Sequence, residues 1–114
     1  MRYSLLTLVL VAACGSSDAI TPPPSTAPAP VVTTSVTMQS RLFAPASIQV
    51  SPGATVTFTN ADNFNHNVTF SGGGVTTIPN FATGSKTTVM PMTAGLYNYT
   101  CTLHSGMNGS VTVK

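Results

Sequence analysis

From about residue 33 to its end, the chain consists of short segments in which apolar and polar residues alternate. A period of two places the apolar side chains on one face of an extended strand. Ser-Pro-Gly, Ser-Gly-Gly-Gly, Ala-Thr-Gly and Thr-Ala-Gly turn sequences separate the segments. The pattern predicts an all-β fold, a Greek-key β-sandwich or barrel of about seven to eight strands. The paired positions expected to face the core are Val36/Met38, Ile48/Val50, Val56/Phe58, Val68/Phe70, Thr87/Val89, Tyr97/Tyr99/Cys101 and Val111/Val113.

The first 32 residues lack this alternation. Residues 1–13 contain Arg2, an apolar run from Leu5 to Val11 and small residues before Cys14, which together indicate an export signal peptide. The run is too short to span a bilayer, and Val-Ala-Ala-Cys resembles a bacterial lipobox. We therefore expect cleavage before Cys14 and a lipid on that residue.

A tether and one domain are expected after the signal. Residues 14–32 are rich in Pro, Ser, Thr and Ala, a composition that predicts a semi-extended linker. Residues 33–114 are then the folded domain. The mature protein is expected in the periplasm or at the cell surface, bound to the membrane by its lipid alone, and as a monomer.

The charge of the chain restricts its partners. Charged residues make up only 5% of the sequence and the net charge is +2, so no basic stripe can neutralise a phosphate backbone. Nucleic acid is therefore excluded as a partner. The loop near the C-terminus carries no charged residue, so docking there is expected to depend weakly on salt. We expect Asp62 to be a solvated loop residue.

The sequence Cys101-Thr-Leu-His104-Ser-Gly-Met107 places a thiolate, an imidazole and a thioether in one loop before the last strand. Two imidazoles and a thiolate in a trigonal plane, with a weak axial methionine, form the electron-transfer copper arrangement. The chain has only one other histidine, His66, which lies in a loop between two predicted strands. Loops distant in sequence can meet at one end of a sandwich. These four residues are therefore candidate copper ligands.

Other interpretations of the same residues exist. Cys101 could be an inert buried thiol or could pair with Cys14 in a disulfide. Zinc is the other candidate metal, although zinc favours nitrogen, thiolate and carboxylate ligands over a thioether. Met90 and Met92 are expected to pack in the core rather than to bind metal. Tyrosines can carry electrons, but Tyr97 and Tyr99 are expected to pack, with their hydroxyls bonded to the backbone.

Three stretches of the chain resemble the cupredoxins, small blue copper proteins of the plastocyanin and amicyanin type, over most of residues 41–114. The first, F-x-P-x-x-I-x-V-x-P-G-x-T-V-x-F-x-N from Phe43 to Asn60, resembles the opening strands of the family. The second, H-N-V at His66, resembles its first ligand motif. The third, G-x-Y-x-Y-x-C-x2-H-x2-M-x-G from Gly95 to Gly109, resembles its ligand loop, with an amicyanin-like gap before the methionine.

The resemblance assigns roles to the candidate ligands. It implies that His66, Cys101 and His104 are equatorial ligands and that Met107 is axial. It also implies that the residue after the first histidine is bonded to the residue after the cysteine. These second-sphere residues are Asn67 and Thr102. The family often has proline at positions 103 and 105, where this chain has leucine and serine.

The function implied by the resemblance is that of a mononuclear type 1 copper protein. Such a protein holds one copper ion, alternates between Cu(I) and Cu(II), and carries single electrons between a redox donor and a redox acceptor protein. It is not an enzyme. A copper oxidase or nitrite reductase would need further histidines, and a dinuclear site would need a second cysteine in the loop. A copper chaperone or storage module, or a metal-free immunoglobulin-like surface module, remain as alternatives.

Overall fold

The computed structural model describes residues 29–114. The predicted signal peptide, Cys14 and most of the tether lie outside these residues. All regular structure in the described part is strand, and no helix there could cross a membrane. The strands are β1 (Val31–Val32), β2 (Ser35–Gln39), β3 (Leu42–Ala44), β4 (Ser47–Val50), β5 (Thr55–Asn60), β6 (His66–Phe70), β7 (Ile78–Phe81), β8 (Gly84–Val89), β9 (Gly95–Thr100) and β10 (Asn108–Val113).

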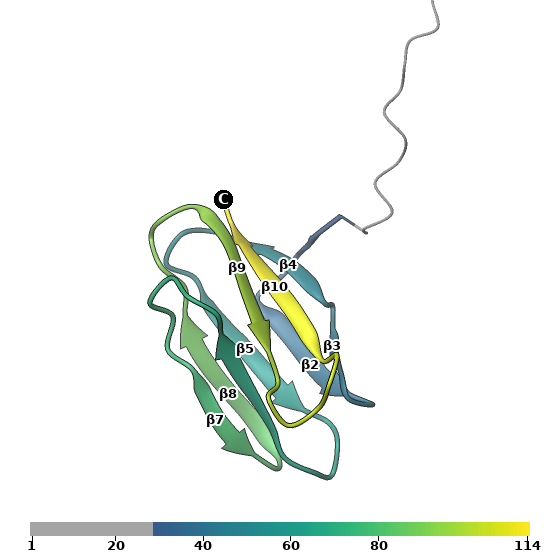
Figure 1. Cartoon of the computed structure of the whole chain (residues 1–114). Coiled ribbons are helices and arrows are strands. Elements are labelled where there is room, and N and C mark those ends of the chain that lie inside the picture. The colour runs from purple at the N-terminus through teal and green to yellow at the C-terminus, as the bar shows by residue number, and fades with distance from the viewer. Residues whose placement is uncertain (1–28) are drawn as a thin grey trace, which may run out of the picture.

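The strands form two sheets that pack against each other (Figure 1). One has the order β1-β4-β10-β9-β6-β7 and the other the order β3-β2-β5-β8. Most neighbours are antiparallel, whereas β1 with β4, β4 with β10 and β2 with β5 are parallel, as expected where the chain crosses between sheets. The predicted all-β sandwich is confirmed. The described residues hold ten strands rather than seven to eight because β1, β3 and β7 are short edge strands with little alternation.

The predicted inward positions fill the core, with one exception in β8. Thr87 and Val89 were expected inside, but Val89 is 62% exposed and Thr88 is buried instead. The hydroxyl of Thr88 donates to the carbonyl oxygen of Thr76 at 3.0 Å, which satisfies it in the core. β8 is an edge strand, and its exposed face needs no apolar residues. Met90, two residues after Thr88, is the next apolar residue on the inner face and is buried.

Met90 lies in the core as predicted, whereas the prediction for Met92 is wrong. Met92 is 75% exposed in the turn between β8 and β9, where its sulfur lies beside Gly53. The reason is that the chain leaves the sheet after Met90, whose backbone NH donates to the carbonyl oxygen of Ala54 at 2.8 Å. Period-two alternation therefore no longer applies beyond that residue.

The strand directions gather four connections at one end of the sandwich. These are the β2–β3, β5–β6, β7–β8 and β9–β10 loops, at the bottom of Figure 1.

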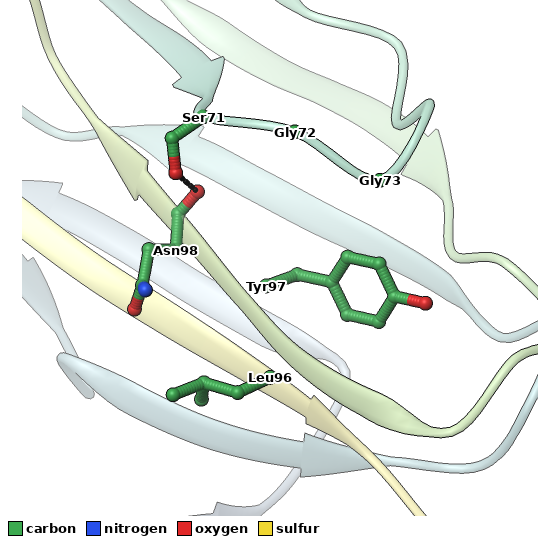
Figure 2. A pocket seen from close by; sticks show the side chains of 6 residues that line it. All are labelled: Ser71, Gly72, Gly73, Leu96, Tyr97 and Asn98. Carbon is green, nitrogen blue, oxygen red and sulfur yellow. Dashed lines mark hydrogen bonds between the residues drawn. The ribbon is translucent and has the colours of Figure 1, made fainter.

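An open pocket of about 240 Å³ lies elsewhere, between the loop after β6 and the first half of β9. Ser71, Gly72, Gly73, Leu96, Tyr97 and Asn98 line it (Figure 2). None of these is an acid, a base or a metal-ligating residue, so the chemistry of the molecule resides at the loop end.

An aromatic cluster packs the core behind that end. The Tyr99 ring lies edge-on to Phe43 with the ring centroids 4.7 Å apart, and to Phe58 at 5.3 Å. Across the sheet Tyr99 pairs with Gly109. A Cβ at Gly109 would come within 2.4 Å of the Tyr99 ring, so only glycine leaves room for it.

Gly109→Ala is expected to destabilise the apo domain by about 1–3 kcal/mol, the usual cost of overpacking a core. Tyr99 cannot yield readily because aromatic rings surround it. Urea unfolding measures the change in the free energy of unfolding. Gly72→Ala is the matched control, since a Cβ there meets nothing within 4 Å, and it should shift that free energy by less than about 0.5 kcal/mol. Equal effects of the two variants would contradict the packing described.

Candidate metal centre

Three metal-ligating side chains converge at the loop end. His66 is the first residue of β6, Cys101 directly follows β9, and His104 lies in the β9–β10 loop. One ligand atom from each lies within 4.8 Å of the others. The Cys101 sulfur is 3.8 Å from Nδ1 of His66 and 3.6 Å from Nδ1 of His104. The structure thus brings together residues that are 35 positions apart in the sequence.

These separations fit a shared metal ion. Metal–nitrogen bonds of about 2.0 Å and metal–sulfur bonds of about 2.3 Å, at trigonal angles, place nitrogen and sulfur roughly 3.7 Å apart. Both observed distances lie within about 0.1 Å of that value. Cys101 is only 1% exposed, which protects a thiolate from oxidants and water. The donor set of two imidazoles and one thiolate is that of an electron-transfer copper site.

Met107 closes the loop over the same region. Its side chain is 1% exposed. Its carbonyl oxygen accepts from the backbone NH of Cys101 at 2.9 Å and from the hydroxyl of Thr100 at 3.0 Å. The loop between the two residues is therefore pinned at its base, where a fourth ligand is expected.

A tight turn connects His104 to Met107. The backbone NH of Met107 donates to the carbonyl oxygen of His104 at 3.3 Å, and Gly106 has φ +78°. A positive φ at the third position is the mark of a type II turn, in which proline is common at the second position. That second position is Ser105 here. The glycine and the hydrogen bond set the turn without a proline.

Asn67 connects the metal loop to the sheet. Its side-chain amide donates to Oγ1 of Thr102 at 2.8 Å and to Oδ1 of Asn80 at 2.9 Å. Its Oδ1 accepts from the backbone NH of Thr102 at 3.1 Å and from the hydroxyl of Thr69 at 3.1 Å. The contact between Asn67 and Thr102 that the resemblance implied is therefore present, and it is bidentate. It fixes the residue that follows Cys101.

Asp62 is not the solvated loop residue that the sequence suggested. Its side chain is 11% exposed, and its Oδ2 lies 2.7 Å from Nε2 of His66. Its carboxylate also accepts from the backbone NH groups of Ser40 and Arg41 at 2.8 and 3.1 Å. Burial alone would raise the pKa of Asp62, but the hydrogen bonds from His66, Arg41 and Ser40 outweigh it and lower the pKa.

The Asp62 contact fixes the tautomer of the first histidine. An ionised carboxylate can only accept, so Nε2 of His66 carries the proton and Nδ1 keeps its lone pair. That lone pair belongs to the nitrogen that faces the Cys101 sulfur. Such outer partners orient ligating histidines and raise their basicity. One feature of the sequence could have indicated this role of Asp62. It is the only acidic residue among residues 29–114, and it lies on the loop that leads to His66.

Asp62→Ala is expected to weaken copper binding by about 10- to 100-fold, the usual effect of removing an outer-sphere partner of a ligating histidine. Asp62→Asn should retain most of the affinity, because its amide oxygen can still accept from Nε2 of His66. Competition titration of the apo protein against a chelator of known affinity measures both variants. The role assigned to Asp62 would be wrong if alanine and asparagine behaved alike.

His104 is the ligand nearest to solvent. It is half-buried, whereas His66 and Cys101 are fully buried. Its ring lies 4.9 Å from that of His66 and 5.3 Å from that of Phe64, measured between centroids. Desolvation, followed by the charges of His66 and Arg41, lowers the pKa of His104. The imidazole therefore tends to stay neutral, the form that binds a metal.

The two tyrosines of β9 have packing roles. The hydroxyl of Tyr97 donates to the carbonyl oxygen of Thr93 at 2.7 Å, as expected for a tyrosine near the corner of a sandwich. Tyr99 also packs, but its buried hydroxyl has no hydrogen-bond partner among the described residues, contrary to expectation. Burial raises the pKa of Tyr99. Without a nearby proton acceptor, its oxidation would be unfavourable.

Known proteins share both the sequence pattern and the fold. The family model of copper binding proteins of the plastocyanin/azurin family matches residues 30–114. The match begins next to β1, slightly before the expected domain start at residue 33. A plastocyanin from Scenedesmus fuscus is 33% identical over 85 residues, which cover 64% of this chain and 87% of that protein.

Among solved structures, an oxidised methionine-to-leucine variant of amicyanin is 28% identical, with a TM-score of 0.62 over 70% of this chain and 80% of that one. A reduced Cu(I) form of another amicyanin variant is 28% identical, with a TM-score of 0.64 over 80% and 95%. A purple cupredoxin from Nitrosopumilus maritimus, 24% identical with a TM-score of 0.62 over 70% and 98%, shares the fold. This chain belongs to the plastocyanin/azurin family of copper binding proteins, the cupredoxins, and copper is its cofactor.

Proposed function

We propose that the protein is a mononuclear type 1 copper protein that carries single electrons between two redox proteins. The observation that supports this most is the convergence of His66, Cys101 and His104 within 4.8 Å, on a loop pinned at Met107. Copper supplies the one-electron change between Cu(I) and Cu(II). The side chains supply one geometry that both oxidation states accept.

Rigidity of the ligands supports a carrier role. Asp62 fixes the ring of His66, and Asn67 fixes the residue after Cys101. Asp62 is itself bonded to the turn between β2 and β3, and Asn67 is a residue of β6, so both anchors connect the ligands to the sandwich. An electron carrier needs such fixed ligands, because any movement of the ligands between oxidation states slows transfer. A chaperone that releases its metal would gain nothing from them.

The exposed part of the site supports electron transfer to and from a partner through His104. Among the three clustered ligands only His104 reaches the surface, and Leu103 beside it is 47% exposed. Ser105 and Gly106 are small and exposed, so a partner can approach closely. We infer that a donor and an acceptor both dock over this apolar surface and exchange the electron through the imidazole edge.

Voltammetry of the copper-loaded protein tests the carrier role. A reversible one-electron wave, with copper retained through repeated cycles, is the expected result. Loss of copper on reduction would instead indicate a chaperone or storage module. Failure of the purified protein to bind copper would contradict the proposal altogether.

We further propose that the protein works outside the cytoplasm, attached by a lipid on Cys14. This rests on the signal-like residues 1–13, the Val-Ala-Ala-Cys sequence and the Pro-rich segment that follows. A tether raises the effective concentration of a carrier near membrane-bound partners. Mass spectrometry of the native protein should find a diacylated or triacylated N-terminal cysteine. A free Cys14, or cleavage at another residue, would refute this part.

A further inference from the structure

The turn between β2 and β3 is strained in a way that the sandwich alone does not require. Ser40 and Arg41 have φ of 55° and 59°, in the left-handed region that residues other than glycine rarely adopt. Two-residue hairpins with this geometry usually carry Asn-Gly. Here the Asp62 carboxylate accepts from both backbone NH groups and thereby holds the turn. Strained residues held by their surroundings concentrate at functional sites.

The strained turn places a positive charge beside the metal centre. The Arg41 guanidinium lies over the Phe64 ring, with Cζ 5.4 Å from its centroid. The Phe64 ring in turn contacts both ligand imidazoles, with centroids 5.1 Å from His66 and 5.3 Å from His104. Phe64 is held because Asn60 donates to its carbonyl oxygen at 2.9 Å. Arg41, Phe64 and His104 thus form one continuous surface, which we call the Arg41 face.

Arg41 has no carboxylate partner among the described residues. Asp62 is the only acidic side chain there, and its oxygens are occupied by the turn and by His66. The only ion-pair contact in the described part joins Asp62 to His66. Of the other two cations of residues 29–114, Lys86 is the third residue of β8, which starts at the loop end, whereas Lys114 follows β10 at the opposite end of the sandwich (Figure 1). An exposed cation fixed on an aromatic ring is therefore available to a partner.

We propose that the Arg41 face is a docking site for a redox protein that presents a carboxylate beside its own electron entry point. The proposal rests on the electron-carrier function above. Pairing of that carboxylate with Arg41 would place the partner over Phe64 and the His104 edge. No local sequence pattern indicates this role, because Arg41 lies 63 residues before His104 and outside the ligand loop.

Small redox complexes of opposite charge test the local field. The hexacyanoferrate(III) anion and the tris(phenanthroline)cobalt(III) cation each take one electron from the reduced copper protein, with no bond formed or broken. Stopped-flow oxidation at low ionic strength is compared for wild type, Arg41→Gln, Arg41→Lys and Lys114→Gln. The Lys114 variant removes the same charge at the opposite end of the sandwich. The reduction potential of each variant is measured so that driving force can be corrected for.

Arg41→Gln is expected to lower the rate with the anion about threefold to tenfold and to raise the rate with the cation. Arg41→Lys should restore most of the rate with the anion, and Lys114→Gln should change neither rate by more than about 1.5-fold. Equal effects of Arg41→Gln and Lys114→Gln would overturn the proposal, because net charge alone would then explain them. If neither complex oxidised the reduced protein, the carrier function itself would fail, and the docking site with it.

Discussion

Cys101→Ser is expected to abolish the visible absorption of the Cu(II) protein while leaving the sandwich folded. The band requires a thiolate bound to copper, and Cys101 is the only cysteine among the described residues. Serine is of similar size to cysteine, so its hydroxyl fits the site beside Nδ1 of His66 and Nδ1 of His104. The core forms from residues of both sheets and does not depend on the sulfur.

Visible absorption and far-ultraviolet circular dichroism of the same sample separate the two effects. The variant should be colourless with Cu(II) and should keep the β-type spectrum of wild type. Cys14→Ser is the matched control, because it removes the other cysteine of the chain and should leave the band unchanged. An intense band in Cys101→Ser would show that the thiolate assignment is wrong.

Asn67→Ala is expected to lower the free energy of unfolding of the apo domain by about 2–4 kcal/mol. Four hydrogen bonds disappear, two of them to Thr102, and each contributes roughly 0.5–1.5 kcal/mol. One of the four is the bond from the backbone NH of Thr102, which is left without its acceptor. Chemical denaturation measures the loss.

Asn98→Ala is the control for Asn67→Ala. Asn98 is exposed and its side-chain amide makes no hydrogen bond within the described residues, so its loss should change the free energy of unfolding by less than about 0.5 kcal/mol. If the two asparagine variants were equally stable, the connection between β6 and the metal loop would contribute nothing to the free energy of unfolding.

The local patterns of the sequence were enough to predict most of the fold and the ligands. Strands β2, β4 and β5 alternate throughout because one face of each is buried, and β6 and β10 alternate over their last three residues. The ligand loop could be found because Cys101, His104 and Met107 are close in the sequence. His66 followed because the chain contains no third histidine.

The features that the sequence did not reveal depend on contacts between loops. Asp62 interacts with Ser40 and Arg41, which are more than twenty residues away, and no local pattern reports that contact. The same holds for Arg41 over Phe64. The phase error in β8 has a different cause, since an edge strand can bury a hydrogen-bonded threonine and expose a valine. Short strands such as β3 are defined by their ladder partners rather than by their own residues.

Titration of the purified apo protein with Cu(II), followed by its visible spectrum, decides whether His66, Cys101 and His104 form a type 1 copper site. The close approach of two imidazoles to the buried Cys101 sulfur predicts an intense thiolate-to-copper band that grows to saturation at one copper ion per chain. Only weak absorption, or saturation with zinc in preference to copper, would contradict the assignment of these residues as a type 1 copper site.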